Sequence, residues 1–410
     1  MTTTRLRWVV KYAACGPSPT CEDRNIELPE EWGVLKTTAI QWTGWKEHEH
    51  KRLPEEFWGS KNLEVRKGDV VVTKAGPRHR VGVSAYVNKT RPQLVVSGKM
   101  ILLRAEQSAI DPRYLNWQLA TPKPQAYLNA CKTGMAEAQM NFANEDLLGM
   151  EIELPPLDEQ RRIADFLDTE TARIDQLVAL QESAVSKVNK RDQAVRDSLV
   201  DALAHQVGVL PLRRYASAIE QGASPSCENH PREEGKWGVL KLSAVKGGRF
   251  YPDENKQLPD YIDPIREYEV HNGDLLVSRA NTPELVGDVA VARGASRGLL
   301  LPDLIYRVRL GREIDADFAA QVFLSTKVRG LIQATARGSS QSMVKLRGED
   351  IREWPMPRAS MLQQKELVTA INETLESSAR LSATVNRQLT LLAERRQALI
   401  TAAVTGEISV

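Results

Sequence analysis

The sequence lacks several features that mark whole classes of protein. No run of about 18 apolar residues occurs, and the N-terminal stretch has no long apolar region of the kind found in secretion signals. The four cysteines form no C-x-x-C pair and no Cys/His spacing that suits zinc, which argues against a disulfide framework and against a metal site. We therefore expect a cytoplasmic protein that holds no metal and contacts no membrane.

Motifs of catalysis are also missing. The sequence contains no phosphate-binding G-x-x-x-x-G-K-[ST], no G-x-G-x-x-G after a strand, no H-E-x-x-H and no G-x-S-x-G. Pro302-Asp303 lacks the downstream acid-x-Lys of a metal nuclease, and residues 154–157 (LPPL) are not an amino-methyltransferase tetrapeptide. The net charge of +2 permits nucleic-acid binding without predicting it. The sequence therefore predicts a recognition protein without catalytic residues.

Two long segments without proline or glycine predict two long helices, over residues 158–206 and 363–404. Asp158 is a favourable N-cap for the first of them. Apolar residues recur in both at alternating spacings of four and three, which is typical of a coiled coil, and we expect the helices to pair antiparallel rather than to lie on separate cores. The predicted contact residues are Ile163, Leu167, Ile174, Leu177, Val188, Leu367, Ile371, Leu381, Val385, Leu392 and Leu399.

An internal repeat relates the two halves of the chain at an offset near 205 residues. Residues 32–36 (WGVLK) recur identically at 237–241, and Gly68-Asp69 recurs as Gly273-Asp274. The repeat predicts an α+β protein in which two similar β-rich lobes are joined by the two long helices with pseudo-twofold symmetry. The predicted segments are a first lobe (1–155), a central helical region (156–206), a second lobe (207–358) and a distal helical region (359–410).

Two similar but non-identical lobes suit a target with two short, different elements, and half-sites on one face of double-stranded DNA recur every ~34–36 Å. The lobes differ most in loop-like segments. Arg and Lys there could bind guanine edges or phosphates, and Asn and Gln adenine edges, although each could simply be a solvated surface residue. The predicted DNA-binding residues are Lys36, Lys74, Arg78, His79, Arg80, Lys132, Thr133, Gln139 and Asn141, then Lys241, Arg279, Asn281, Thr282, Arg337, Ser339, Ser340, Gln341 and Lys345.

Residues that recur in both halves of the chain are interpreted as framework residues. Trp32 and Trp237 begin a matched strand, and we expect them in the core rather than stacked on bases. Gly68-Asp69 and Gly273-Asp274 are interpreted as turns ahead of a strand, rather than as phosphate or metal ligands.

Two stretches carry a resemblance to a known family. Residues 152–163 (IELPPLDEQRRI) with 166–175, and residues 394–406 (ERRQALITAAVTG), resemble the central and distal helical regions of specificity subunits of type I restriction–modification systems. The resemblance implies two target recognition domains that each read one half of a split, asymmetric site in double-stranded DNA, with the helices as a ruler for the gap. One departure is that the second helix is preceded by MPRAS where the first follows LPP.

The same resemblance implies partners and excludes a cofactor in this chain. Two adenine-N6 methyltransferase subunits, which bind S-adenosylmethionine, would dock on the helices, and motor-nuclease restriction subunits would join them. Three alternatives stay open: a recognition subunit of another methyltransferase–nuclease arrangement, a coiled-coil adaptor whose lobes bind proteins, and a nuclease with an unrecognised site. Sequence-specific DNA binding by the assembled complex would exclude the adaptor, and metal-dependent cleavage by the isolated chain would support the nuclease.

Overall fold

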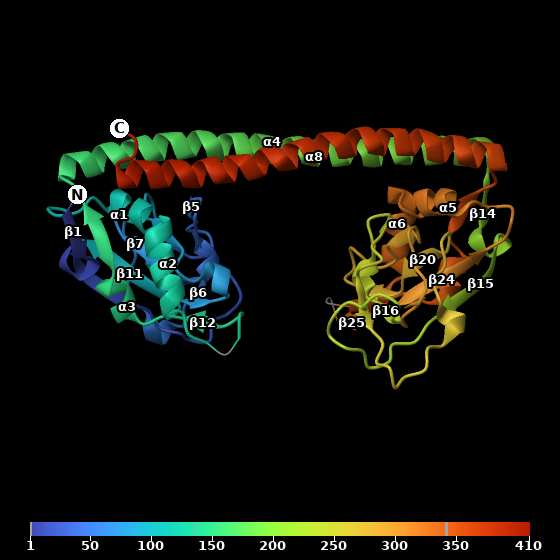
Figure 1. Ribbon diagram of the computed structural model, residues 1–410, viewed down its shortest axis with the longest axis horizontal. Helices are drawn as coiled ribbons and strands as arrows, with labels where there is room; N and C mark the ends of the chain where they lie inside the picture. Colours follow the sequence, from blue (N-terminus) through green and yellow to red (C-terminus); the bar gives the residue numbers. More distant parts are fainter. Residues whose placement is uncertain (1, 135, 341–342) are drawn as a thin grey trace. The chain divides into compact units, whose positions relative to one another are not determined.

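The computed structural model describes residues 2–134, 136–340 and 343–410. The chain forms two compact units: unit 1 consists of Met1–Glu182 and Asn386–Val410, and unit 2 of Ser183–Val385. Both unit boundaries fall inside long helices, so each unit holds a globular part and a portion of both helices (Figure 1). Helices and sheets occur together in each unit, which confirms the α+β class.

The two long helices are α4 (Leu157–Val207) and α8 (Met361–Thr405). The prediction that Asp158 is the N-cap is wrong by two residues, because α4 begins at Leu157 and Pro156 is the N-cap; Asp158 lies in the first turn, where its charge still favours the helix N-terminus. The start of α8 has a capping box. The Ser360 N–H donates to Gln363 Oε1 at 2.9 Å, and the Gln363 N–H donates to Ser360 Oγ at 3.4 Å.

Unit 1 is built on an antiparallel sheet in the order β2-β11-β7-β9. Its main strands are β2 (Val10–Cys15), β7 (Val70–Thr73), β9 (Ser84–Tyr86) and β11 (Met100–Ala105). A smaller sheet joins β10 (Leu94–Val95), β3 (Gly33–Leu35) and β6 (His50–Arg52), and β1 (Thr2–Arg5) pairs with β13 (Glu151–Leu154). The short helices are α1 (Pro112–Leu119), α2 (Pro122–Cys131) and α3 (Asn144–Gly149).

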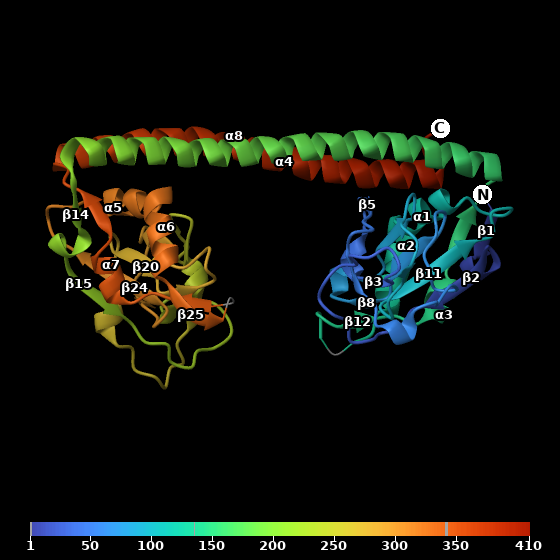
Figure 2. The same ribbon diagram turned by 180° about the vertical axis from the view of Figure 1, so that it is seen from behind.

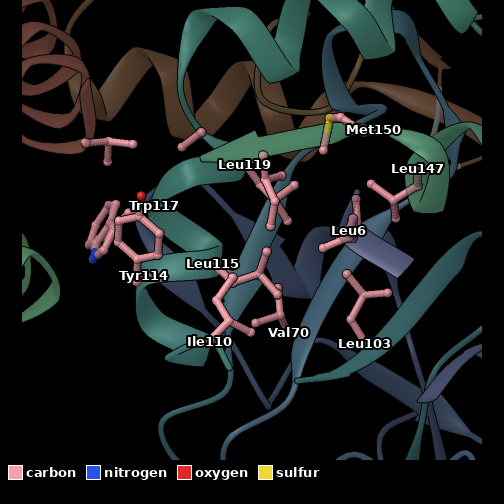
Figure 3. Packing of buried hydrophobic residues seen from close by; sticks show 14 of the residues in the cluster. Leu6, Val70, Leu103, Ile110, Tyr114, Leu115, Trp117, Leu119, Leu147 and Met150 are labelled. Atoms are coloured by element: carbon pink, nitrogen blue, oxygen red, sulfur yellow. The ribbon is translucent and has the colours of Figure 1, made fainter. Parts of the chain in front are cut away.

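The central sheet of unit 1 is buried on both faces. Val70 and Val72 pack with α1, α4 and α8, while Val71 between them packs on the opposite face. The alternation follows from the two-residue period of a strand, and burial on both sides explains why the strand is a continuous apolar run. Figure 3 shows Val70 beside Ile110 and Leu115 in the cluster that faces the helices.

Unit 2 repeats this arrangement with the sheet order β15-β24-β20-β22. The strands β15, β24 and β20 of this sheet are labelled in Figure 2. Its strands are β15 (Ala216–Gln221), β20 (Leu275–Ser278), β22 (Val289–Val291) and β24 (Ile305–Leu310), with β19 (Asn255–Gln257), β16 (Gly238–Leu240) and β23 (Leu299–Leu300) in a smaller sheet and β14 (Val209–Pro211) paired with β27 (Pro355–Pro357). The short helices are α5 (Ala316–Phe323), α6 (Thr326–Thr335) and α7 (Gly348–Arg352).

The structure tests several predictions about the framework. Trp32 is 8% exposed, as expected of a core residue, and Trp237 packs against a buried cluster. Asp69 accepts a hydrogen bond from the Arg66 N–H at 2.8 Å, which fits a turn. The apolar run 94–104 forms two strands, β10 and β11, and the chain between them packs tightly, since a Cβ on Gly98 would lie 2.1 Å from Ser18 Oγ.

The predicted helix contacts are partly wrong in each unit. Ile163, Leu167 and Ile174 are buried in unit 1, but Leu177 is 49% exposed and Val178 is partly buried instead. In unit 2, Leu367, Ile371 and Val385 are buried and Val188 partly so, while Leu381 is 49% exposed. Leu392 and Leu399 are partly buried in unit 1. At Leu177 and Leu381 the predicted contact lies one residue too early, because Val178 and Ser382 are the partly buried residues there.

Polar residues in the helix interface caused this error. In unit 2, Ser378 Oγ donates to Asp192 Oδ1 at 2.7 Å, and both residues are buried. In unit 1, Gln181 Nε2 donates to Gln388 Oε1 at 3.1 Å. Polar side chains occupy positions in the helix interface, and Leu177 and Leu381 occupy exposed positions. A prediction from apolar periodicity alone therefore selects the exposed leucine instead of the residue that follows it.

Within the described residues, no helix is both long enough and apolar enough to cross a membrane. Over the same parts of the chain, no cluster of three or more His, Cys, Asp or Glu side chains could hold a metal ion. All four cysteines are free thiols.

Candidate nucleic-acid interface

In unit 1, two predicted sets of DNA-binding residues lie side by side. The short strand β8 (Ala75–Gly76) pairs antiparallel with β12 (Met140–Asn141), and Thr133 bridges to Asn141. This pairing places Lys74 and Arg78 next to the 132–141 segment, although the two segments are far apart in sequence. We refer to this pair of segments, 74–80 and 132–141, as edge 1.

Arg78 and Lys132 form the centre of edge 1. The Arg78 N–H donates to the Glu137 carbonyl at 2.9 Å, and Arg78 Nη1 donates to Glu137 Oε1 at 3.1 Å. Lys132 Nζ donates to the Arg78 carbonyl at 2.9 Å and to Asn129 Oδ1 at 2.5 Å. Together with Trp42 and His79 these residues line a groove of about 410 Å³.

The electrostatics of this groove favour an anion. Burial, and next the proximity of Arg78, lower the pKa of Lys132 below its ordinary value. Among the described residues, no carboxylate forms an ion pair with the Lys132 ammonium. The pair between Arg78 and Glu137 is exposed on both sides, and such pairs contribute little. Arg78 can therefore exchange Glu137 for an external acceptor.

Arg80 has a different environment from Arg78. Its Nη2 donates to the carbonyls of Thr37 and Ile40, at 2.5 and 3.0 Å. These bonds attach the short helix at 78–80 to the segment after β3, next to Lys36. Arg80 thus fixes the loop, and its role in base reading stays a prediction. His79, Thr133, Gln139 and Asn141 are exposed at the same edge.

In unit 2, the corresponding residues lie on a three-stranded ribbon in the order β21-β26-β25. The strands are β21 (Ala280–Asn281), β26 (Met343–Lys345) and β25 (Arg337–Ser340). Ala280 is opposite Lys345, which is also opposite Arg337. Asn281, Arg337 and Lys345 therefore come together, and we refer to this ribbon as edge 2. Gln341 and the side chains of Ser339 and Ser340 lie outside the described residues.

Three other predicted residues of unit 2 have partners within the unit. Arg279 Nε donates to Tyr306 Oη at 3.1 Å, and the guanidinium lies 5.9 Å from the centre of that ring. The Thr282 N–H donates to Asn281 Oδ1 at 2.9 Å, which closes a local turn. Lys241 Nζ lies 3.8 Å from a Glu254 carboxylate oxygen, in an exposed pair of little energetic value.

Two buried glutamines, which the sequence analysis missed, attach the globular parts to the long helices. Gln160 is 1% exposed; its Oε1 accepts from the Asp111 N–H at 2.9 Å and its Nε2 donates to the Pro155 carbonyl at 2.8 Å. Gln364 is 2% exposed and makes the same bonds, with the Asp315 N–H at 2.8 Å and the Ala359 carbonyl at 2.9 Å. The two glutamines are 204 residues apart, and this offset in the repeat could have identified them from the sequence.

A second contact is also repeated, with one instructive difference. Gln397 Nε2 donates to the Ala120 carbonyl at 3.1 Å in unit 1, and Gln193 Nε2 donates to the Leu324 carbonyl at 3.0 Å in unit 2. In unit 2, Asp197 also accepts the N–H of Thr326, the first residue of α6. Helix α2 of unit 1 begins with proline, which has no N–H to satisfy.

Comparison with known proteins finds similarity to a DNA specificity domain and to two specificity subunits. Residues 49–183 match the family model of the type I restriction modification DNA specificity domain. The chain is 36% identical over 198 residues to the type I restriction enzyme EcoEI specificity subunit of Escherichia coli, covering 48% of this chain and 33% of that one. It is 24% identical over 301 residues to the EcoKI specificity subunit of Escherichia coli (strain K12), covering 70% and 64%.

These alignments span about a third and just under two thirds of the length of the two relatives. A solved structure concerning complex assembly and conformational transition of the type I R-M system matches with a TM-score of 0.68 at 18% identity, over 99% of this chain and 98% of that chain. The last match shows a shared fold. The resemblance drawn from the sequence is confirmed.

Proposed function

We propose that the chain is the sequence-recognition subunit of a type I restriction–modification complex, because residues 49–183 match the model of the type I restriction modification DNA specificity domain. Residues 1–155 and 207–358 would be its target recognition domains, each reading one half of a bipartite, asymmetric site in double-stranded DNA. Residues 156–206 and 359–410 would pair as an antiparallel coiled coil that sets the gap between the halves.

One observation carries this proposal. Edge 1 and edge 2 arise at equivalent places in the repeat, yet they present different side chains: Arg78 and Lys132 in unit 1, and Asn281, Arg337 and Lys345 in unit 2. Arginine and lysine suit guanine edges and phosphates, and asparagine suits adenine. A common framework with two different polar edges is what two different half-sites require.

The proposal includes partners. Leucines stay exposed on the long helices and could be covered by methyltransferase subunits, of which we propose two; restriction subunits would join that assembly. The exposed leucines are Leu177, Leu180 and Leu391 in unit 1, and Leu362 and Leu381 in unit 2. Leu177 and Leu381, which were predicted to lie in the helix interface, would thus belong to a docking surface. S-adenosylmethionine would bind the methyltransferase and not this chain.

A methylation map tests the proposal. The chain would be expressed with the methyltransferase subunit encoded beside it, in a host without adenine methylation, and the modified genome would be sequenced. We expect a split motif of two short, different half-sites at a constant gap. A contiguous motif would show that one unit does not read DNA, and absence of methylation would favour the protein-binding adaptor.

A further inference from the structure

Unit 1 has a second groove beside edge 1, with a volume of about 400 Å³. Three lysines and three hydroxyl residues contribute to its lining, and we call it the lysine groove. They are Lys36, Lys51, Lys99, Ser18, Thr37 and Ser97. Its wall forms where segments 16–18 and 96–98 pack closely, since a Cβ on Gly16 would lie 1.6 Å from the Val96 carbonyl oxygen.

The lysine groove carries net positive charge. No carboxylate is among its lining residues. Across the described chain, Lys51 is the one lysine of the three with a carboxylate partner, Asp23 at 2.9 Å, and that aspartate side chain is 80% exposed. Glu49, the other acid nearby, accepts from Thr38 Oγ1 at 2.6 Å. The ammonium groups of Lys36 and Lys99 thus remain available to an external anion.

Hydrogen bonds to main-chain carbonyls connect the lysine groove to edge 1. The Lys99 carbonyl accepts from the N–H groups of Lys74 and Ala75, at 2.8 and 3.3 Å. The Thr37 carbonyl accepts from Arg80 at 2.5 Å. The groove therefore continues the surface that contains Lys74, Arg78 and Lys132.

We propose that the lysine groove binds the sugar–phosphate backbone of DNA next to the half-site read by unit 1. Lysine ammonium and serine or threonine hydroxyl groups are common ligands of phosphate oxygens, and such contacts fix register without carrying sequence information. The proposal rests on the proposed function, because it assigns a backbone contact to the same DNA-bound state.

Unit 2 keeps only part of this groove chemistry: Lys241 and Lys256 stand where unit 1 has Lys36 and Lys51, but the other positions differ. Leu304 stands where unit 1 has Lys99, Pro302 where it has Ser97, and Asp303 where it has Gly98. Ser224, equivalent to Ser18, donates its hydroxyl hydrogen bond to Asp303, whose N–H donates back to Ser224 Oγ at 3.2 Å. Unit 2 thus gains a carboxylate, loses a lysine and uses its serine internally. The backbone contact is expected in unit 1 only.

The test exchanges the residues at this position. Complexes of the chain with its methyltransferase subunit would be titrated with a duplex that carries the mapped site, over a range of potassium chloride concentrations. Lys99→Leu should lower the slope of log affinity against log salt by about one and weaken binding about tenfold near 0.1 M salt, and Leu304→Lys should raise the slope. Lys99→Gln should behave as Lys99→Leu if the charge is what matters.

The control is Lys123→Leu, which removes an exposed lysine of unit 1 that does not line the groove and should leave the slope unchanged. All variants should methylate the same motif. An unchanged slope in Lys99→Leu overturns the backbone contact while DNA recognition stands, and so does a changed motif, which would make Lys99 a base reader. If the wild-type complex binds no DNA, the proposed function fails and this inference fails with it.

Discussion

The two units share the bonds that build the framework and differ in the residues that could contact a ligand. Gln160 and Gln364 make the same buried hydrogen bonds, and Arg104 and Arg309 each bind the aspartate of the matched Gly-Asp turn at 3.2 Å. The polar residues of edge 1 and edge 2 make no such matching hydrogen bonds. Polar residues that recur with the same bonds in both units therefore mark structural positions, and those that differ are candidates for recognition.

One residue pair of the central sheet differs in character between the two units. In unit 1, Leu102 lies opposite Ala14 in the central sheet, whereas in unit 2 Arg307 lies opposite Glu220. Arg307 is 1% exposed, and its Nε donates to Glu220 Oε2 at 2.7 Å while Nη1 donates to the Glu269 carbonyl at 2.6 Å. An apolar pair and an ion pair with a buried arginine thus occupy the same place, and this difference can be tested by exchange.

The largest expected effect is a longer gap between the two half-sites, with the sequence of each half-site unchanged. Insertion of seven residues in α4 and seven in α8 would add about 10 Å to each helix at 1.5 Å per residue, while keeping the heptad phase. We expect methylation to move to a motif with the same two half-sites and a longer gap. Unchanged gap length in the methylation map would remove the ruler from the proposed function.

Removal of the buried arginine should destabilise unit 2 strongly. Arg307→Leu removes the buried donor of the Glu269 carbonyl and one of the two arginines that bind Glu220, at a cost of about 3 kcal/mol in the free energy of unfolding. The double variant Arg307→Leu/Glu220→Ala installs the pair that unit 1 has, and should recover most of that loss. Urea denaturation measures both. If the double variant were as unstable as the single one, the two cores would not be interchangeable at this position.

The two glutamine anchors should be equivalent. Gln160→Leu and Gln364→Leu each leave one N–H and nearby carbonyls without their buried partner, and we expect each to cost about 2 kcal/mol in the free energy of unfolding. The measurement is urea denaturation of each variant against wild type. A loss confined to one variant would show that the anchors have separate roles despite their identical bonds.

Substitutions in edge 1 should weaken the recognition of one half-site only. Arg78→Ala is expected to reduce discrimination at one half of the motif by about 1–3 kcal/mol, since its exposed pair with Glu137 leaves the guanidinium available to DNA. Arg80→Ala should weaken the same half-site and also destabilise the loop, because two carbonyls lose their donor. Methylation rates on duplexes altered in one half-site distinguish these effects. Equal loss at both halves would instead indicate general phosphate contacts by Arg78.

How far the sequence determined these conclusions depends on the kind of signal. Periodicity and the absence of proline and glycine predicted α4 and α8 to within a few residues at each end. The same periodicity misplaced Leu177 and Leu381, since polar pairs such as Asp192 with Ser378 occupy the helix interface. The β8–β12 pairing could not be predicted, because strands of two residues carry no period and their partners are distant in sequence.

The smallest expected effect concerns pH and again compares the two core pairs. Burial raises the pKa of Glu220, but hydrogen bonds from Arg309 and Arg307 outweigh it, so that the pKa lies below its ordinary value. A carboxyl with a lowered folded-state pKa stabilises the fold above its unfolded pKa of about 4.3, and this contribution disappears as pH falls through the folded value. The double variant Arg307→Leu/Glu220→Ala lacks the group, so its stability relative to wild type should improve between pH 5.5 and 3. Urea denaturation at several pH values tests this, and parallel curves for the two proteins would show that Glu220 titrates alike in the folded and unfolded chains.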